Sequence, residues 1–278
     1  MRDAAELAIA PGHLLPLVCG DLQVDVAPEA GGRLAQVTCG GRPWLVPAQD
    51  VADVGIAWGS YPMLPWAGRI REGRFAFDGK LYQLPPNLGP HAIHGVGFQR
   101  PWRVDVIAID RCRLSLALPS DADWPFGGEV TQDIALTPRR MLLRLSLTAS
   151  ERAMPCPVLG WHPWLLKPER LAFTPSAMYP RDAAGIAVLP PGSPSPGPWD
   201  DCFIQRGAVR VSRGGMTLGL RSDCDHWVVY DQPAHATCIE PQTGPPDAFN
   251  LRTLRLEPGE TVRAWSEWRF DDQRHDNT

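Results

Sequence analysis

Hydrophobic and polar residues alternate with a period of two along most of the chain. In the last such segment Val262, Ala264, Ser266, Trp268 and Phe270 share one face. A period of two places neighbouring side chains on opposite faces of an extended strand, which suits a half-buried sheet. Similar segments occur at 22–26, 103–109, 111–118, 142–148, 209–212 and 216–220. The pattern therefore predicts an all-β protein of antiparallel sheets.

Two turn signals support this prediction. Gly40–Gly41 and Asp78–Gly79 each lie between two strand-like runs, and both pairs tolerate the positive φ of a two-residue hairpin. No convincing amphipathic pattern of 12 or more residues is present, and no repeat of 20–50 residues indicates a propeller or a solenoid. The 30 prolines and 26 glycines also argue against a helical bundle, because both residues interrupt helices.

The length of 278 residues allows one large β domain or two ordinary domains. The most irregular segment, 190–198, reads PPGSPSPGP and could be a linker between domains. Strand-like segments of the same style lie on both sides of it. We therefore expect a stiffened surface loop within a single domain that spans 1–278.

Charge and cysteine usage narrow the function classes. The chain has 27 basic and 31 acidic residues and a net charge of −4. It therefore lacks the strong positive field that would attract nucleic acid or an anionic membrane. No run of 18 apolar residues predicts a membrane-spanning helix, and the N-terminus is a poor signal peptide. The seven cysteines are scattered and form no CxxC pair. They indicate reduced thiols in a cytoplasmic protein. From the charge and the lack of a long apolar run we expect no nucleic-acid or membrane partner.

Polar groups gather among aromatic and turn residues in a few stretches: 61–71, 87–99, 160–164, 239–250 and, more weakly, 199–203. They contain His91, His94, His162 and Glu240, a set that could bind zinc or iron in a metal-dependent β-barrel enzyme. The usual HExxH and HxH signatures are absent, however. Any one of these histidines could instead be a hydrogen-bonded structural residue.

The segment GWHPW places His162 between Trp161 and Trp164. Rigid aromatic faces suit the C–H faces of a sugar ring, although some of the 11 tryptophans must belong to the core. Glu240 follows the apolar residues 236–239, so we expect it at a strand end. A partly desolvated carboxylate there would have a raised pKa, as a general base working near neutral pH needs. The polar side chains that follow it, Gln242 among them, favour a binding site over a plain loop.

Taken in order, these stretches resemble the aldose 1-epimerase (galactose mutarotase) family, in its shorter bacterial type. The resemblance covers nearly the whole chain and rests on PMLPWAGRI, RFAFDGKLYQLPPN, HAIHG, GWHPW, WDD and EPQTGPPDAFN. It implies a galactose mutarotase-like β-supersandwich that binds a pyranose on its concave face, with no metal or organic cofactor. It also implies interconversion of the α and β anomers of a free aldohexose.

The resemblance assigns roles by position. Glu240 matches the general base, His162 the general acid, and His94 the residue that supports charge near the ring oxygen. Arg69 matches the substrate-binding arginine, and Asp200 the carboxylate that holds sugar hydroxyls. Such a mechanism suits a carboxylate of raised pKa and a histidine that titrates near pH 7.

Other candidates come from the same stretches. Asn87, Trp161 and Gln242 are predicted to bind substrate as well, and Asp201 is an alternative to Asp200. His91 is expected to support the site without touching the sugar. The oligomeric state stays open, and a non-catalytic carbohydrate-binding protein is an alternative from another class.

The chain departs from the family pattern beside Arg69. Gly68 replaces an asparagine that often precedes this arginine, so one substrate hydrogen bond is missing or is supplied by water. The nearby Arg71 and Arg74 leave a phosphorylated hexose as an alternative substrate. We favour the interpretation that both are solvated strand residues.

Overall fold

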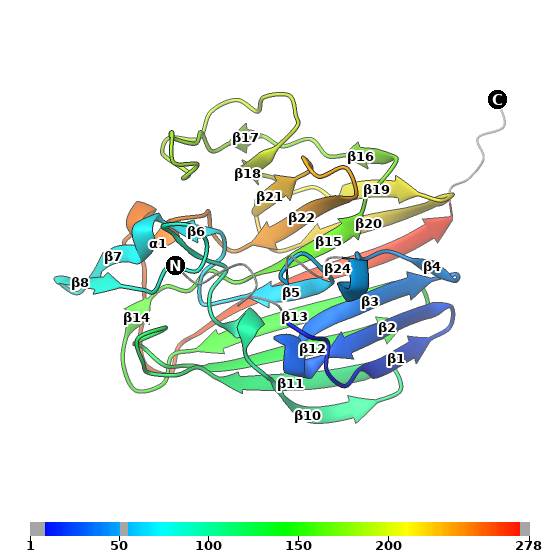
Figure 1. The fold of residues 1–278 in the computed structure, drawn as a ribbon, viewed down its shortest axis with the longest axis horizontal. Helices are drawn as coiled ribbons and strands as arrows, with labels where there is room; N and C mark the ends of the chain where they lie inside the picture. The colour runs from blue at the N-terminus through cyan, green and yellow to red at the C-terminus, as the bar shows by residue number, and fades with distance from the viewer. Residues whose placement is uncertain (1–8, 51–54, 273–278) are drawn as a thin grey trace.

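The computed structural model describes residues 9–50 and 55–272 and consists almost wholly of β-strands (Figure 1). The strand pairs of its two large sheets are antiparallel, for example β12 (Glu129–Thr137) with β13 (Arg140–Thr148). The prediction of an all-β protein with antiparallel sheets is confirmed. Within the described residues, no helix is long and apolar enough to cross a membrane.

The larger sheet has ten strands. Nine follow one path, and β4 (Arg42–Pro43) pairs with β3 beside that path. In spatial order the nine are β1 (Leu15–Cys19), β2 (Leu22–Ala27), β3 (Arg33–Cys39), β5 (Ser60–Met63), β15 (Gly160–Leu166), β22 (Ala236–Gln242), β21 (His226–Tyr230), β18 (Asp200–Ile204) and β17 (Ala177–Met178).

The smaller sheet has eight strands. In spatial order they are β10 (Arg103–Ala108), β11 (Arg111–Ala117), β12, β13, β24 (Thr261–Asp272), β20 (Met216–Ser222), β19 (Val209–Arg213) and β16 (Arg170–Ala172). Most of the period-2 segments predicted from the sequence lie here.

Short elements surround one end of the large sheets. They are the pairs β6 (Arg69–Ile70) with β9 (Ala92–Ile93), β7 (Arg74–Phe77) with β8 (Lys80–Gln83), and β14 (Met154–Pro155) with β23 (Arg255–Leu256), together with the single turn of helix α1 (Ala248–Leu251). Short 3-10 turns occupy Pro28–Ala30, Ala48–Asp50, Arg71–Gly73 and Gly97–Gln99.

The main hydrophobic core draws on both sheets. Val24 and Val37 of the larger sheet belong to the same buried cluster as Leu143 and Trp268 of the smaller one. Strand β24 shows how the sequence pattern is used, because its buried positions alternate with exposed or half-buried ones through Phe270. The sheets therefore pack face to face over apolar side chains, as a period of two requires.

Both predicted hairpins are present, since Cys39 pairs with Arg42 and Phe77 with Lys80. The proline-rich segment lies in the connection between β17 and β18, which pair with each other, so it is a loop between neighbouring strands. The seven cysteines, all in the described part of the chain, are free thiols.

Candidate active site

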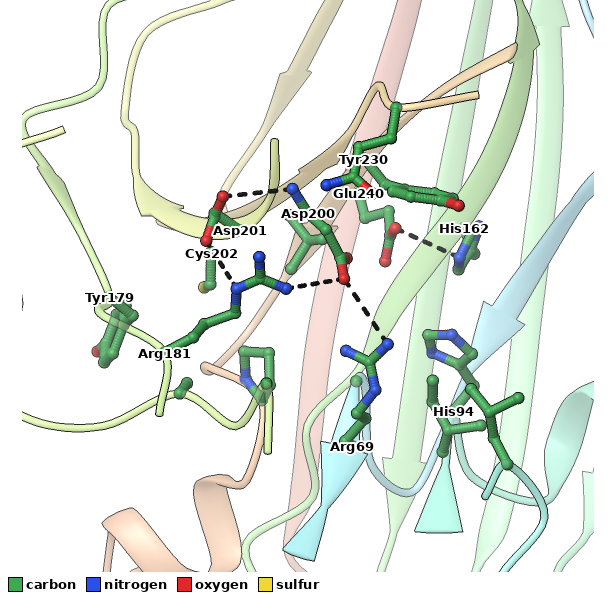
Figure 2. A pocket seen from close by; sticks show the side chains of 18 of the residues that line it. Arg69, His94, His162, Tyr179, Arg181, Asp200, Asp201, Cys202, Tyr230 and Glu240 are labelled. Carbon is green, nitrogen blue, oxygen red and sulfur yellow. Dashed lines mark hydrogen bonds and ion pairs between the residues drawn. The ribbon is translucent and has the colours of Figure 1, made fainter. Parts of the chain in front are cut away.

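A pocket of about 270 Å³ lies over the middle of the ten-stranded sheet. Its floor comes from four neighbouring strands, β15, β22, β21 and β18. The cross-strand register brings the floor side chains together, because Val228 pairs with both Cys202 and Glu240. Loops that carry β6, β9 and the connection between β17 and β18 form the walls (Figure 2).

Glu240 and His162 face each other on this floor. His162 Nε2 lies 3.3 Å from Glu240 Oε1, and the two residues are 5% and 2% exposed. Burial raises the pKa of Glu240 well above its usual value, and the charge of Asp200 raises it further. Burial also lowers the pKa of His162 to about 3. Both shifts favour the neutral forms, with the proton of the pair on Glu240 and a neutral imidazole at His162. The prediction of a histidine titrating near pH 7 is therefore wrong, because desolvation favours neutral imidazole.

Aromatic rings fix the orientation of His162. Its imidazole stacks between Tyr61, at 4.8 Å and 22°, and Trp164, at 5.3 Å and 17°. The buried guanidinium of Arg33 lies over the Tyr61 ring, 4.8 Å from its centroid, and its charge also lowers the pKa of His162. The imidazole is thus held with its Nε2 toward the carboxylate of Glu240.

His94 approaches His162 edge to face, with ring centroids 4.8 Å apart and an angle of 87°. Its backbone adopts a left-handed φ of 61°, and its N–H donates to the carbonyl of Gly68 at 3.0 Å. Burial lowers the pKa of His94 well below its usual value, and His162 and Arg69 lower it further. The two imidazoles and Glu240 thus converge on one part of the pocket.

Arg69 enters the pocket from β6, which pairs with the β9 segment that precedes His94. Asp247 anchors its strand, because the Asp247 N–H donates to the Arg69 carbonyl at 2.8 Å and Asp247 Oδ1 accepts from Arg71 N–H at 3.0 Å. One Arg69 nitrogen lies 3.7 Å from Asp200 Oδ2. The structure thus brings together Glu240, His162, His94, Arg69 and Asp200, although they span more than half of the chain.

Trp161 does not line the pocket, contrary to its prediction as a substrate-binding residue. Since successive residues of a strand face opposite sides, a pocket-facing His162 turns Trp161 into the core between the sheets. Trp161 is 1% exposed and donates from Nε1 to Gln132 Oε1 at 3.1 Å. Trp164, two residues after His162, lines the pocket instead.

Asn87 and Gln242 also lie outside the pocket lining. The Asn87 side chain donates to the carbonyl of Ile93 at 3.0 Å and accepts from its N–H at 2.7 Å, which closes the loop before His94. Gln242 is completely buried and donates to Glu240 Oε2 at 3.2 Å. Both therefore position neighbouring site residues, and Glu240 lies inside β22, two residues before the end of that strand.

His91 lies outside the pocket lining, as expected. Its Nδ1 accepts a hydrogen bond from the N–H of Glu72 at 3.0 Å. Within the described residues, the cluster of possible metal ligands is His162, Cys238 and Glu240, whose ligand atoms lie within 4.8 Å of one another. The three-histidine set that the sequence left open as a metal site does not assemble, because His91 is hydrogen-bonded to Glu72 in another loop.

Several lining residues carried no signal that marked them in the sequence. Arg181 and Tyr179 come from the irregular loop after β17, and Tyr230 comes from β21. Arg181 binds both Asp200 and Asp201, at 2.9 Å each. Both aspartates therefore line the pocket, although they are consecutive on β18.

Comparisons with known proteins agree with this fold. The sequence matches the family model for aldose 1-epimerase over residues 21–172. It is 29% identical over 149 residues to the uncharacterized protein YphB and 28% identical over 117 residues to the uncharacterized protein YihR, both of Escherichia coli K12. These matches cover 52% and 41% of this chain, and they span only 49% and 37% of the two relatives.

Solved structures resemble it over nearly the full length. A GalM/aldose epimerase homologue from Caenorhabditis elegans has a TM-score of 0.82 at 16% identity, covering 94% of this chain and 99% of that chain. A galactose 1-epimerase from Lactobacillus acidophilus has a TM-score of 0.74 at 18% identity, covering 94% and 95%. The predicted galactose mutarotase-like fold is confirmed.

Proposed function

The chain belongs to the aldose 1-epimerase family, and from that premise we propose that it is a mutarotase. It would interconvert the α and β anomers of a free aldohexose by opening and reclosing the sugar ring. The observation that carries the proposal is the buried contact of 3.3 Å between Glu240 and His162 on the pocket floor. We also infer that the whole chain acts as one domain, because the proposed site draws on residues from Arg69 to Glu240.

The reaction requires one base and one acid, on opposite sides of the C1–O5 unit of the sugar. Glu240, as carboxylate, takes the proton of the anomeric hydroxyl while protonated His162 gives its proton to the ring oxygen, and the C1–O5 bond breaks. After rotation about C1–C2 the open-chain aldehyde recloses, and both protons return. Each group of this kind contributes about 10²–10⁴-fold.

The shared proton suits this exchange. The raised pKa of Glu240 and the lowered pKa of His162 support a resting pair that holds one proton, on Glu240. Moving it across the 3.3 Å contact to His162 yields carboxylate and imidazolium without taking up a proton from solvent. A sugar that displaces water from the pocket supplies new hydrogen-bond partners to both groups. The number of protons on the pair is then the same before and after each turnover.

The surrounding residues support this assignment. His94 lies edge-on to His162, where it can accept or donate near the ring oxygen. Arg69 and Asp200 lie across the pocket and offer a donor and an acceptor to sugar hydroxyls. Polar side chains on opposite walls fix the orientation of a ligand in a small pocket.

A phosphorylated hexose is the alternative substrate, and it requires arginines that are free to bind phosphate. Arg71 lies 2.6 Å from Asp182, and Arg74 lies 3.0 Å from Glu72. Neither arginine lines the pocket. These contacts favour a sugar without a phosphate group.

Anomer exchange of glucose and galactose, followed by polarimetry or NMR, tests the proposal. We expect acceleration by the wild type and a loss of about 10²–10⁴-fold in Glu240→Gln. Glu129→Gln, on the exposed face of β12, is the matched control and should leave the rate unchanged. Failure to accelerate anomer exchange of any free aldose would refute the proposed enzyme activity. Calorimetric sugar binding without exchange would instead establish a non-catalytic binding protein.

A further inference from the structure

The loop between β17 and β18 contributes one wall of the pocket, with Tyr179 and Arg181 on it (Figure 2). Tyr179 fixes its start, since its N–H donates to the Cys202 carbonyl at 2.8 Å and its hydroxyl lies 3.1 Å from His226 Nε2. Asp182 fixes its turn by accepting from the N–H groups of Ala184 and Ile186, at 2.9 and 3.1 Å. The side chain between these two anchors, Arg181, is therefore held toward the pocket.

Arg181 contacts two carboxylates at once. Its Nη1 lies 2.9 Å from Asp200 Oδ2, and its Nε lies 2.9 Å from Asp201 Oδ1. Asp200 also lies 3.7 Å from Arg69. The side chains are only 14–31% exposed, so water screens them less than a surface pair. Two positive and two negative side chains thus lie in contact where this wall meets β18 and β6.

We propose that Arg181 and Asp201 are specificity-determining residues that make this wall accept a hydroxyl-bearing sugar and reject an anionic one. The inference deepens the proposed function and rests on it. A sugar hydroxyl both donates and accepts, so it can donate to a carboxylate and accept from a guanidinium without breaking their contact. A phosphate accepts hydrogen bonds and carries negative charge, so it must draw Arg181 or Arg69 away from Asp200 and then lie beside two carboxylates.

The arrangement predicts opposite effects for its two members. Asp201→Asn keeps the size of the side chain and leaves Arg181 partly uncompensated, so it should favour a phosphorylated sugar. Arg181→Met keeps much of the length and removes the positive charge, so it should penalise that sugar further. One charge at this separation in a partly screened pocket changes a ratio of affinities by roughly tenfold.

Asp182→Asn is the matched control. It weakens the ion pair of 2.6 Å that fastens the loop to Arg71, but Asp182 does not line the pocket. A purely structural role for the loop predicts that Asp182→Asn, Arg181→Met and Asp201→Asn impair both sugars alike. A charge-based role predicts that only the two pocket variants change the preference between sugars.

The experiment measures kcat/KM for galactose and galactose 6-phosphate in the wild type and these three variants. Calorimetric affinities for both sugars are measured in parallel. We expect the wild type to favour galactose by at least roughly tenfold, and the ratio to fall in Asp201→Asn, rise in Arg181→Met and stay constant in Asp182→Asn. An equal ratio in all four proteins, or a shift in the same direction in both pocket variants, would overturn the assignment. If binding ratios follow the expected order but no protein exchanges anomers, the specificity role stands and the mutarotase proposal fails.

Discussion

Gly68 offers a sharp test of how the pocket wall is built. It stands where the resemblance to the family led us to expect an asparagine, and its φ is +67°. A Cβ added there would lie 2.7 Å from Cβ, 2.8 Å from Cγ and 3.1 Å from Cα of Pro246. Both residues line the pocket. We therefore expect Gly68→Asn to destabilise the protein without restoring a missing substrate contact.

The size of the effect follows from two separate terms. A left-handed backbone costs a residue other than glycine about 1–2 kcal/mol. Forcing extra atoms into a packed site adds about 1–3 kcal/mol, and the ring of Pro246 cannot rotate away. Gly68→Ala should therefore lower the free energy of unfolding by about 2–5 kcal/mol. Asparagine tolerates the left-handed region better than alanine, so Gly68→Asn should lose less to backbone strain and as much to the clash.

The assay is urea unfolding followed by tryptophan fluorescence. Gly41→Ala is the matched control, because Gly41 has a φ of +74° and nothing lies within 4 Å of its added Cβ. It should lose only the backbone term of about 1–2 kcal/mol. Pro246→Gly combined with Gly68→Ala should recover the steric term in a double-mutant cycle.

Equal destabilisation by Gly68→Ala and Gly41→Ala would refute this reasoning, as would a cycle without coupling between positions 68 and 246. The activity provides a second measurement. The Gly68 carbonyl accepts from His94 N–H at 3.0 Å, so displacing this segment moves the imidazole. We expect kcat for anomer exchange to fall in Gly68→Ala and to remain unchanged in Gly41→Ala.

Two further predictions concern the floor of the pocket. Trp161→Phe should lower the free energy of unfolding by about 1–3 kcal/mol and leave KM unchanged, because Trp161 faces the core. Trp164→Ala should raise KM, because Trp164 lines the pocket. Equal effects of the two variants on KM would contradict this assignment of the two faces of β15. In the native state the pair of Glu240 and His162 binds one proton from pH about 3 upward, whereas in the unfolded chain the two groups titrate near 4.5 and 6.5. Between pH 4.5 and 6.5 both states therefore bind one proton, and the contribution of the pair to stability should be level. Below this range the unfolded state binds more protons and above it fewer, so the contribution should fall on either side. His162→Gln should move the start of the alkaline decline from about 6.5 to about 4.5 in urea titrations, and an unchanged profile would disprove the shared proton.

The sequence determined the secondary structure and the main candidates for chemistry. A period of two is typical of extended strands, so the alternation ending at Phe270 predicted its strand and which residues share a face. Gly40–Gly41 and Asp78–Gly79 predicted the hairpins, because glycine and aspartate tolerate positive φ better than most residues. The order of the motifs around His94, His162 and Glu240 predicted the fold family, and the family model and the solved structures confirmed it.

Tertiary structure decided which face each residue uses and what surrounds it. GWHPW offers two tryptophans, and only the pairing of β15 with its neighbours turns Trp161 to the core and Trp164 to the pocket. The low pKa of His162 arises from burial, which no local pattern measures. Arg181 lies in an irregular loop without periodicity, and it meets Asp200 and Asp201 only because β17 and β18 pair. Local sequence specifies backbone conformation, whereas a site depends on contacts between segments far apart in the chain.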